Sequence, residues 1–194
     1  IGAMSRHVSV AESPVVKKAI PALAKLAEGI GDRQVRNRGT LGGSVANNDP
    51  SACYPSAVLA LNATVHTNNR SMAADDFFTG MFETALEEDE IIESISFSKP
   101  TKANYIKFPN PASRYAMVGV FVAQFDDGVR VAVTGAGEGG VFRHEEMESA
   151  LSSDFNADSL SSINIASDGL ISDLHASSEY RANLVKEMTK RAVL

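Results

Sequence analysis

The apolar positions of residues 13–30 recur at the three- and four-residue spacing of an α-helix. Ser13 suits an N-cap and Pro14 suits the first turn, so we expect the helix to begin there. Pro21 lies inside the pattern, where it lacks an N–H and disfavours a helical residue before it. We therefore predict either a kinked helix or two short helices, with Pro21 opening the second.

After residue 50, the pattern changes from helical spacing to shorter apolar or alternating segments. Residues 54–61 indicate a buried helix, residues 63–67 and 71–73 the strands of a hairpin, and residues 90–98 a strand with one polar face. Between them, residues 75–79 are expected to form a short helical turn that carries Phe77 and Phe78 inward.

Residues 99–101, Lys-Pro-Thr, are the best candidate for a domain boundary. Beyond them, residues 103–108, 117–125 and 129–134 indicate three strands of an antiparallel meander, with a turn at residues 126–128. The tail changes character. Residues 147–151 and 179–193 are typical of helices, and the second should bury a stripe made of Tyr180, Leu184, Met188 and Ala192. Strands in one block and helices in another favour an α+β fold.

Composition narrows the function classes. The chain of 194 residues is 44% hydrophobic and 22% charged, as in ordinary globular proteins, and it lacks an apolar run long enough to span a membrane. A formal net charge of −6 argues against nucleic acid as the main partner. The single cysteine excludes an internal disulfide and an iron–sulfur site of the chain's own, so we expect a cytoplasmic protein. The four histidines are widely separated, and we expect none to bind metal.

The strongest chemical signal is the glycine-rich stretch of residues 39–50, G-T-L-G-G-S-V-A-N-N-D-P. Adjacent glycines, Gly42 and Gly43, let a backbone approach a ligand closely and aim successive N–H groups at an anion. The hydroxyls of Thr40 and Ser44 add donors for phosphate oxygens. The alternative is a tight loop that only connects two elements.

A longer run, Q-V-R-N-R-G-T-L-G-G-S-V-A-N-N-D-P, closely resembles the second flavin-binding motif of the medium subunit of carbon monoxide dehydrogenase. It resembles that of xanthine dehydrogenase more loosely. Residues 1–7, 74–92 and 104–120 also resemble segments of these molybdenum hydroxylase subunits, so the resemblance covers nearly the whole chain.

The resemblance implies the fold and its division. Residues 1–100 would be the second FAD-binding subdomain, the C-terminal part of a vanillyl-alcohol-oxidase-like (PCMH-type) domain. Residues 101–194 would be a carbon monoxide dehydrogenase flavoprotein C-terminal domain, with a three-stranded antiparallel sheet and a helical cap. The family's first flavin motif, an A-G-G-Q-S-type loop, would precede Ile1. We therefore expect a fragment that binds FAD weakly or not at all.

The resemblance also implies FAD as the cofactor and assigns the residues that hold it. The backbone of Thr40, Leu41, Gly42, Gly43 and Ser44 would hold the pyrophosphate, with Asp49, Ile92, Lys107 and Tyr115 as the remaining cofactor-binding residues. Ile92 would pack near the flavin, Lys107 would lie at the polar edge of its ring, and Tyr115 would lie against the isoalloxazine. The alternatives are a solvated lysine on an edge strand and a half-buried core aromatic.

One position departs from the family pattern. Cys53 stands where the family commonly has an aspartate that would accept hydrogen bonds from ribityl hydroxyls, and a thiol is a weak acceptor. We therefore predict weaker flavin binding than a Cys53→Asp variant would show.

As a function, the resemblance implies an FAD-binding electron-transfer subunit of an oxidoreductase, with no catalytic residue of its own. Its partners would be a large molybdenum-cofactor subunit and a small [2Fe-2S] subunit, in a dimer of heterotrimers. Two alternatives stay open: a flavin-free interaction module, and an oxidase or reductase of the vanillyl-alcohol type. The G-x-G-x-x-G pattern at residues 135–140 is followed by V-F-R-H, which indicates another strand and not a helix, so we interpret the pattern as a turn and not as a nucleotide site.

Overall fold

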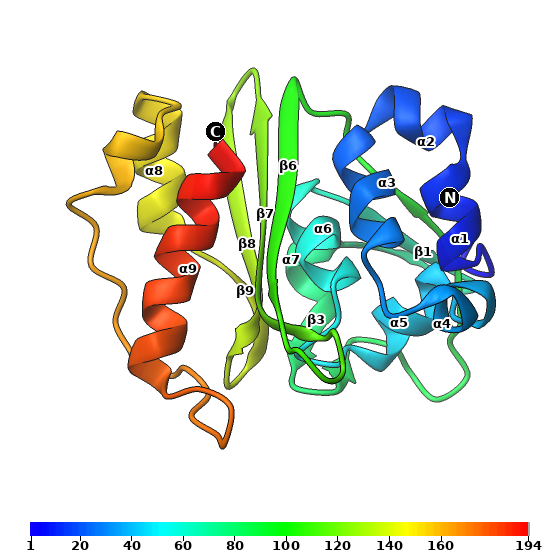
Figure 1. Cartoon of the computed structure of the whole chain (residues 1–194). Helices are drawn as coiled ribbons and strands as arrows, with labels where there is room; N and C mark the ends of the chain where they lie inside the picture. Colours follow the sequence, from blue (N-terminus) through cyan, green and yellow to red (C-terminus); the bar gives the residue numbers. More distant parts are fainter. Residues whose placement is uncertain (194) are drawn as a thin grey trace.

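A computed structural model describes residues 1–193. Helices of the first half and the helices at the C-terminus lie on opposite sides of one antiparallel sheet (Figure 1). The first half contains α1 (His7–Glu12), α2 (Pro14–Ala19), α3 (Pro21–Glu28), α4 (Arg33–Arg38), α5 (Leu41–Asn47), α6 (Tyr54–Ala60) and α7 (Ala74–Phe77). The second contains α8 (Glu145–Ser153), the 3₁₀ turn η1 (Ala157–Leu160) and α9 (Ser178–Val193).

Residues 13–30 form two short helices, α2 and α3, and not one kinked helix, which is the second of the two arrangements predicted from Pro21. The N–H of Val16 donates to Ser13 Oγ at 3.3 Å, which caps α2. Pro21 then occupies the first turn of α3, where its missing N–H costs no helical hydrogen bond.

The centre of the glycine-rich stretch forms a helix, α5, so the alternative of a tight loop that only connects two elements is wrong. Thr40 caps α5 by accepting a hydrogen bond from the Gly43 N–H at 3.1 Å, and Asn48 ends the helix with a φ of 42°. A Cβ on Gly42 would lie 2.4 Å from Ala3 Cβ. The glycine therefore allows α5 to pack directly on the N-terminal segment, and this packing outweighs the low helix propensity of glycine.

A small sheet follows in the order β2-β1-β5, made of β1 (Thr64–Thr67), β2 (Ser71–Ala73) and β5 (Ile92–Ser96). The hairpin β1–β2 confirms the turn predicted at residues 68–70. α7 buries Phe77 completely and leaves Phe78 half-buried at the start of β3 (Phe78–Gly80), which pairs with β4 (Glu83–Thr84).

The large sheet has the order β6-β7-β8-β9 and consists of β6 (Lys102–Pro109), β7 (Ala116–Phe125), β8 (Gly128–Gly137) and β9 (Gly140–Arg143). The resemblance implied three strands, but the sheet has four, because β9 pairs antiparallel with β8 and is the strand that V-F-R-H indicated. That hairpin contains the G-x-G-x-x-G pattern, which is a turn as expected.

The sheet is buried on both faces, which explains the unbroken apolar run of β7. Val118, Val120 and Val122 face the core beneath α8 and α9, whereas Phe121 and Ala123 face the core beneath α3 and α6. A strand covered on both faces has no polar face to alternate with.

The predicted stripe on α9 is correct at Leu184, Met188 and Ala192, which are buried, and wrong at Tyr180, which is 44% exposed. Arg181 takes the inward position instead, donating from Nη1 to the carbonyls of Met117 and Gly135 at 2.6 and 2.8 Å. Across residues 1–193, every helix is too short or too polar to cross a membrane.

Candidate functional site

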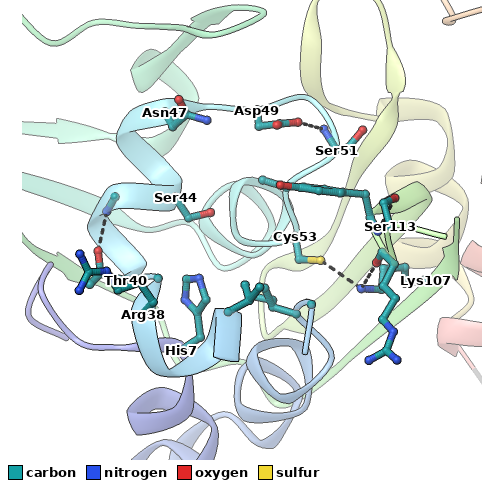
Figure 2. A pocket seen from close by; sticks show the side chains of 18 residues that line it. His7, Arg38, Thr40, Ser44, Asn47, Asp49, Ser51, Cys53, Lys107 and Ser113 are labelled. Carbon is teal, nitrogen blue, oxygen red and sulfur yellow. Dashed lines mark hydrogen bonds between the residues drawn. The ribbon is translucent and has the colours of Figure 1, made fainter. Parts of the chain in front are cut away.

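A cavity of about 560 Å³ lies where α4, α5 and the start of α6 meet the end of β6 and the loop that follows it (Figure 2). Six of the residues proposed from the sequence line it: Thr40, Gly43, Ser44, Asp49, Lys107 and Tyr115. These residues come from segments up to 75 positions apart, and the fold brings them around one cavity.

The other three proposed residues lie elsewhere. Leu41 is fully buried in the core, and Gly42 faces Ala3. Ile92 lies on β5, where it pairs with Thr67 of β1 and packs against the N-terminal core. It is not among the cavity-lining residues.

The backbone of the glycine-rich motif is already occupied by internal hydrogen bonds. The N–H of Leu41 donates to Ser5 O at 2.9 Å and that of Gly42 to Ala3 O at 2.8 Å. The N–H groups of Gly43 and Ser44 both donate to Thr40, to Oγ1 and to the carbonyl. The motif therefore contributes side chains to the cavity, and its four N–H groups hold the helix in place.

Lys107 enters the cavity wall from β6. Its Nζ donates to the carbonyls of Gly29 at 2.7 Å and Arg114 at 3.1 Å, and it lies 3.6 Å from Cys53 Sγ. All three partners are neutral or weak acceptors, and no carboxylate of residues 1–193 lies within ion-pair distance of this ammonium. Lys107 is thus not a freely solvated lysine, and its charge is left uncompensated.

The cavity carries an excess of positive charge. Arg38, Lys107 and Arg114 line it, against the single carboxylate of Asp49. Asp49 Oδ1 accepts a hydrogen bond from the Ser51 N–H at 2.8 Å, which fixes the orientation of this carboxylate. Such a wall attracts an anionic ligand.

Two further residues shape the opening and the floor. Tyr115 is 53% exposed at the edge of the cavity, which excludes the alternative of a core aromatic. Cys53 is only 6% exposed and precedes α6, with its sulfur turned toward Lys107 (Figure 2).

Comparison with known proteins decides the family. Residues 1–100 match the family described as "FAD binding domain in molybdopterin dehydrogenase". The medium subunit of nicotine 6-hydroxylase from Paenarthrobacter nicotinovorans is 36% identical, and the match covers 100% of this chain and 73% of that protein. The chain is an FAD-binding medium subunit of the molybdenum hydroxylase family.

Solved structures agree with this assignment. Quinoline 2-oxidoreductase from Pseudomonas putida 86 superposes with a TM-score of 0.85 at 28% identity, over 100% of this chain and 72% of that one. Carbon monoxide dehydrogenase from Hydrogenophaga pseudoflava gives a TM-score of 0.82 at 30% identity, with the same coverage. The resemblance found in the sequence is confirmed: the medium subunit is part of an oxidoreductase, and its cofactor is FAD.

The cavity of the medium subunit fits this cofactor by the chemistry of its donors. FAD combines a diphosphate, a ribityl chain with hydroxyls and a flat aromatic ring. The wall offers cations for phosphate, the hydroxyls of Thr40 and Ser44, one carboxylate for ribityl hydroxyls, and an exposed tyrosine beside Lys107. Among residues 1–193, no group of three His, Cys, Asp or Glu could hold a metal ion.

Sequence reasoning missed several residues of the wall, notably His7 and Arg114. Arg38 belongs to a basic cluster that is visible in the sequence and suits a phosphate-bearing molecule. His7 gives no such signal, because its place in the cavity depends on contacts with Gly39 and Tyr54, more than 30 positions away.

Proposed function

We propose that the medium subunit transfers electrons from the iron–sulfur clusters of a small [2Fe-2S] subunit, through FAD, to an external acceptor. The substrate would be oxidised at a molybdenum centre in a separate large subunit, and the complex would be a dimer of heterotrimers. Bound FAD supplies the redox chemistry, since it exchanges electrons singly or in pairs. The residues of this chain bind, orient and electrostatically tune the cofactor.

The polar residues of the wall divide into two groups. We assign the diphosphate to Arg38 and to the hydroxyls of Thr40 and Ser44, beside Gly43, which all lie along α4 and the cavity face of α5 (Figure 2). We assign a ribityl hydroxyl to Asp49, whose carboxylate is held by the Ser51 N–H. Leu41 and Gly42 contribute only by packing α5, and Ile92 only by supporting the core.

The flavin ring is assigned to the opposite wall, between Lys107 and Tyr115. The exposed tyrosine ring offers a flat surface to the isoalloxazine. The Lys107 ammonium, held by the carbonyls of Gly29 and Arg114, stabilises negative charge at the polar edge of a reduced flavin. This uncompensated ammonium in the cavity wall is the observation that carries the proposal.

We also propose that residues 1–100 and 101–194 form two domains that hold the cofactor between them. The cavity takes Thr40, Ser44 and Asp49 from the first and Lys107 and Tyr115 from the second. A cofactor bound there would link the two domains and stabilise their contact.

The single cysteine provides a direct test, because every thiol signal of the chain comes from Cys53 in the cavity. Titration with FAD should give bound flavin absorbance and should slow the labelling of Cys53 by a maleimide, whereas AMP at equal concentration should slow it much less. A colourless protein that takes up no FAD, and whose Cys53 reacts with the maleimide at the same rate with and without FAD, would favour the flavin-free interaction module.

A further inference from the structure

His7 begins α1 and lies in the wall of the cavity, next to the start of α5. Its side chain is only 5% exposed, and its ring packs against Tyr54 with a centroid distance of 5.3 Å. Its backbone N–H donates to Gly39 O at 3.0 Å. A Cβ on Gly39 would lie 2.4 Å from His7 Nε2, so the imidazole occupies the space that glycine leaves free.

The ring is buried without hydrogen bonds of its own. Nδ1 is buried and has no partner, whereas Nε2 is not fully buried and makes no hydrogen bond within residues 1–193. Burial lowers the pKa of His7, so its neutral form is favoured. A neutral imidazole always carries one N–H, and leaving buried polar atoms unpaired costs free energy.

The surroundings indicate what would complete these bonds. His7 points into the cavity toward Ser44, on the side that also carries Arg38 and Thr40 (Figure 2). This is the part of the wall assigned to the diphosphate. Phosphate oxygens only accept hydrogen bonds, and a neutral imidazole can donate one without adding a further charge.

We infer that His7 donates a hydrogen bond from its imidazole to a phosphate oxygen of bound FAD. This inference rests on the proposed placement of FAD in the cavity. It makes His7 a binding residue that fixes the position of the diphosphate, and it gives Gly39 a role, since any side chain there would displace the ring.

The test compares three variants by FAD titration and by the ³¹P NMR signals of the bound diphosphate. His7→Phe keeps a ring against Tyr54 but removes both nitrogens, and it should weaken FAD binding about tenfold, the loss expected for a hydrogen bond to a charged acceptor. His7→Gln restores a donor and should recover most of the affinity. His66→Gln is the matched control, because His66 bonds Ser71 and Ser96 outside the cavity and should leave the affinity and the ³¹P shifts unchanged.

Circular dichroism and thermal melting establish that each variant is folded. Gly39→Ala provides a second route, since its Cβ displaces the imidazole without changing His7, and it should weaken binding to the same extent. Wild-type affinity and unchanged ³¹P shifts in His7→Phe would overturn the inference alone, as would a Gln variant as weak as the Phe variant. Failure of the wild-type protein to bind FAD would overturn the proposed function and the inference together.

Discussion

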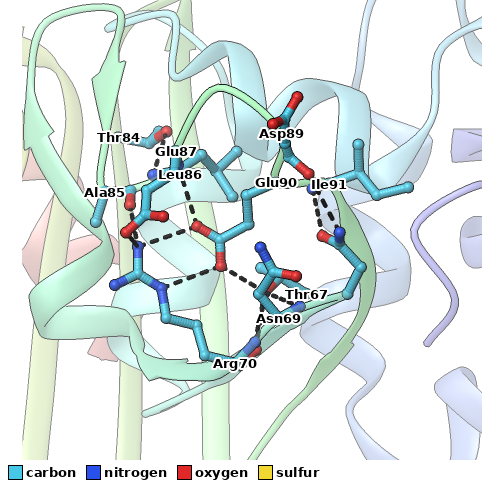
Figure 3. Close-up of polar contacts among 11 residues, drawn as sticks. Thr67, Asn69, Arg70, Thr84, Ala85, Leu86, Glu87, Asp89, Glu90 and Ile91 are labelled. Atoms are coloured by element: carbon cyan, nitrogen blue, oxygen red, sulfur yellow. Dashed lines mark hydrogen bonds and ion pairs between the residues drawn. The ribbon is translucent and has the colours of Figure 1, made fainter.

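Two polar clusters of this molecule differ in how completely their members form hydrogen bonds and ion pairs with one another. The first, which we call the hairpin clasp, consists of Thr67, Arg70, Glu87 and Glu90 (Figure 3). The second consists of the polar groups in the cavity wall. Each contains buried polar atoms. The clasp provides hydrogen-bond partners for its buried carboxylate, Glu90, whereas the cavity wall provides none for the imidazole of His7.

The clasp encloses the carboxylate of Glu90, whose side chain has no exposed surface. Its oxygens accept hydrogen bonds from Thr67 Oγ1 at 2.6 Å, from Arg70 Nε and Nη2 at 3.0 Å each, and from the Glu87 N–H at 3.1 Å. The hydrogen bonds from Arg70 and then Thr67 lower the pKa of Glu90 to about 2. The clasp thereby fastens residues 85–91 to the β1–β2 hairpin.

In the cavity wall, by contrast, charged and polar groups lack partners of opposite charge or any hydrogen-bond partner among residues 1–193. The Lys107 ammonium has neutral partners only, and the His7 imidazole has none. Buried polar groups in folded proteins are almost always paired, so the unpaired Nδ1 of His7 beside the cavity suits a site that a ligand completes. Charged and polar side chains that pair with one another, as in the clasp, stabilise the fold, whereas those of the cavity wall are left available for the cofactor that we propose there.

The largest effect is expected from breaking the clasp. Glu90→Gln removes the charge that pairs with Arg70 and leaves acceptors and donors mismatched, so the thermal midpoint should fall by several degrees. The FAD affinity of the folded protein should not change. Glu88→Gln, at an exposed neighbouring position, is the control. A loss of FAD affinity without a loss of stability would contradict the division between the clusters.

Acid should weaken the clasp in a defined window. The folded-state pKa of Glu90 is about 2, below its ordinary value of 4.5, so its contribution to stability is present above the ordinary value and is lost as the pH falls toward 2. Urea midpoints measured across this range should fall for the wild type and fall less steeply for Glu90→Gln. Parallel curves for the two proteins would show that other carboxylates cause the acid sensitivity.

In the cavity, Lys107→Met should act on binding more than on stability. Removal of the ammonium should weaken FAD binding about tenfold, because the cavity loses one of the three cations that attract the anionic cofactor. The thermal midpoint should change little, because the carbonyls of Gly29 and Arg114 can bind water instead. Lys102→Met, at the exposed start of β6, is the matched control, and equal affinities in the two variants would exclude the role assigned to Lys107.

The smallest expected effect is a gain. Cys53→Asp places a carboxylate next to Lys107, where the sulfur now lies at 3.6 Å, and offers a better acceptor for ribityl hydroxyls. FAD should bind a few-fold more tightly than to the wild type or to Cys53→Ser, which controls for size and weak polarity. Equal FAD affinity in the wild type and the Asp variant, measured by titration, would contradict the hypothesis that Cys53 weakens flavin binding.

The sequence predicts well where local chemistry decides the structure. Pro21 divides α2 from α3, the turn at residues 68–70 closes a hairpin, and residues 126–128 connect β7 to β8. It fails where packing decides. α5 is a helix because Thr40 caps it and Gly42 lets it contact Ala3, and the adjacent glycines conceal this by their low helix propensity.

The site shows the same division. The sequence by itself determined the family and six of the residues that line the cavity, because the residues of the motif keep their order and spacing along the chain. Only the tertiary structure decided where each one lies and what it contacts. Lys107 meets the carbonyl of Gly29 across 78 positions, and the His7 imidazole lies over Gly39. Such contacts depend on how elements far apart in the sequence pack together, so they cannot be predicted from local propensities.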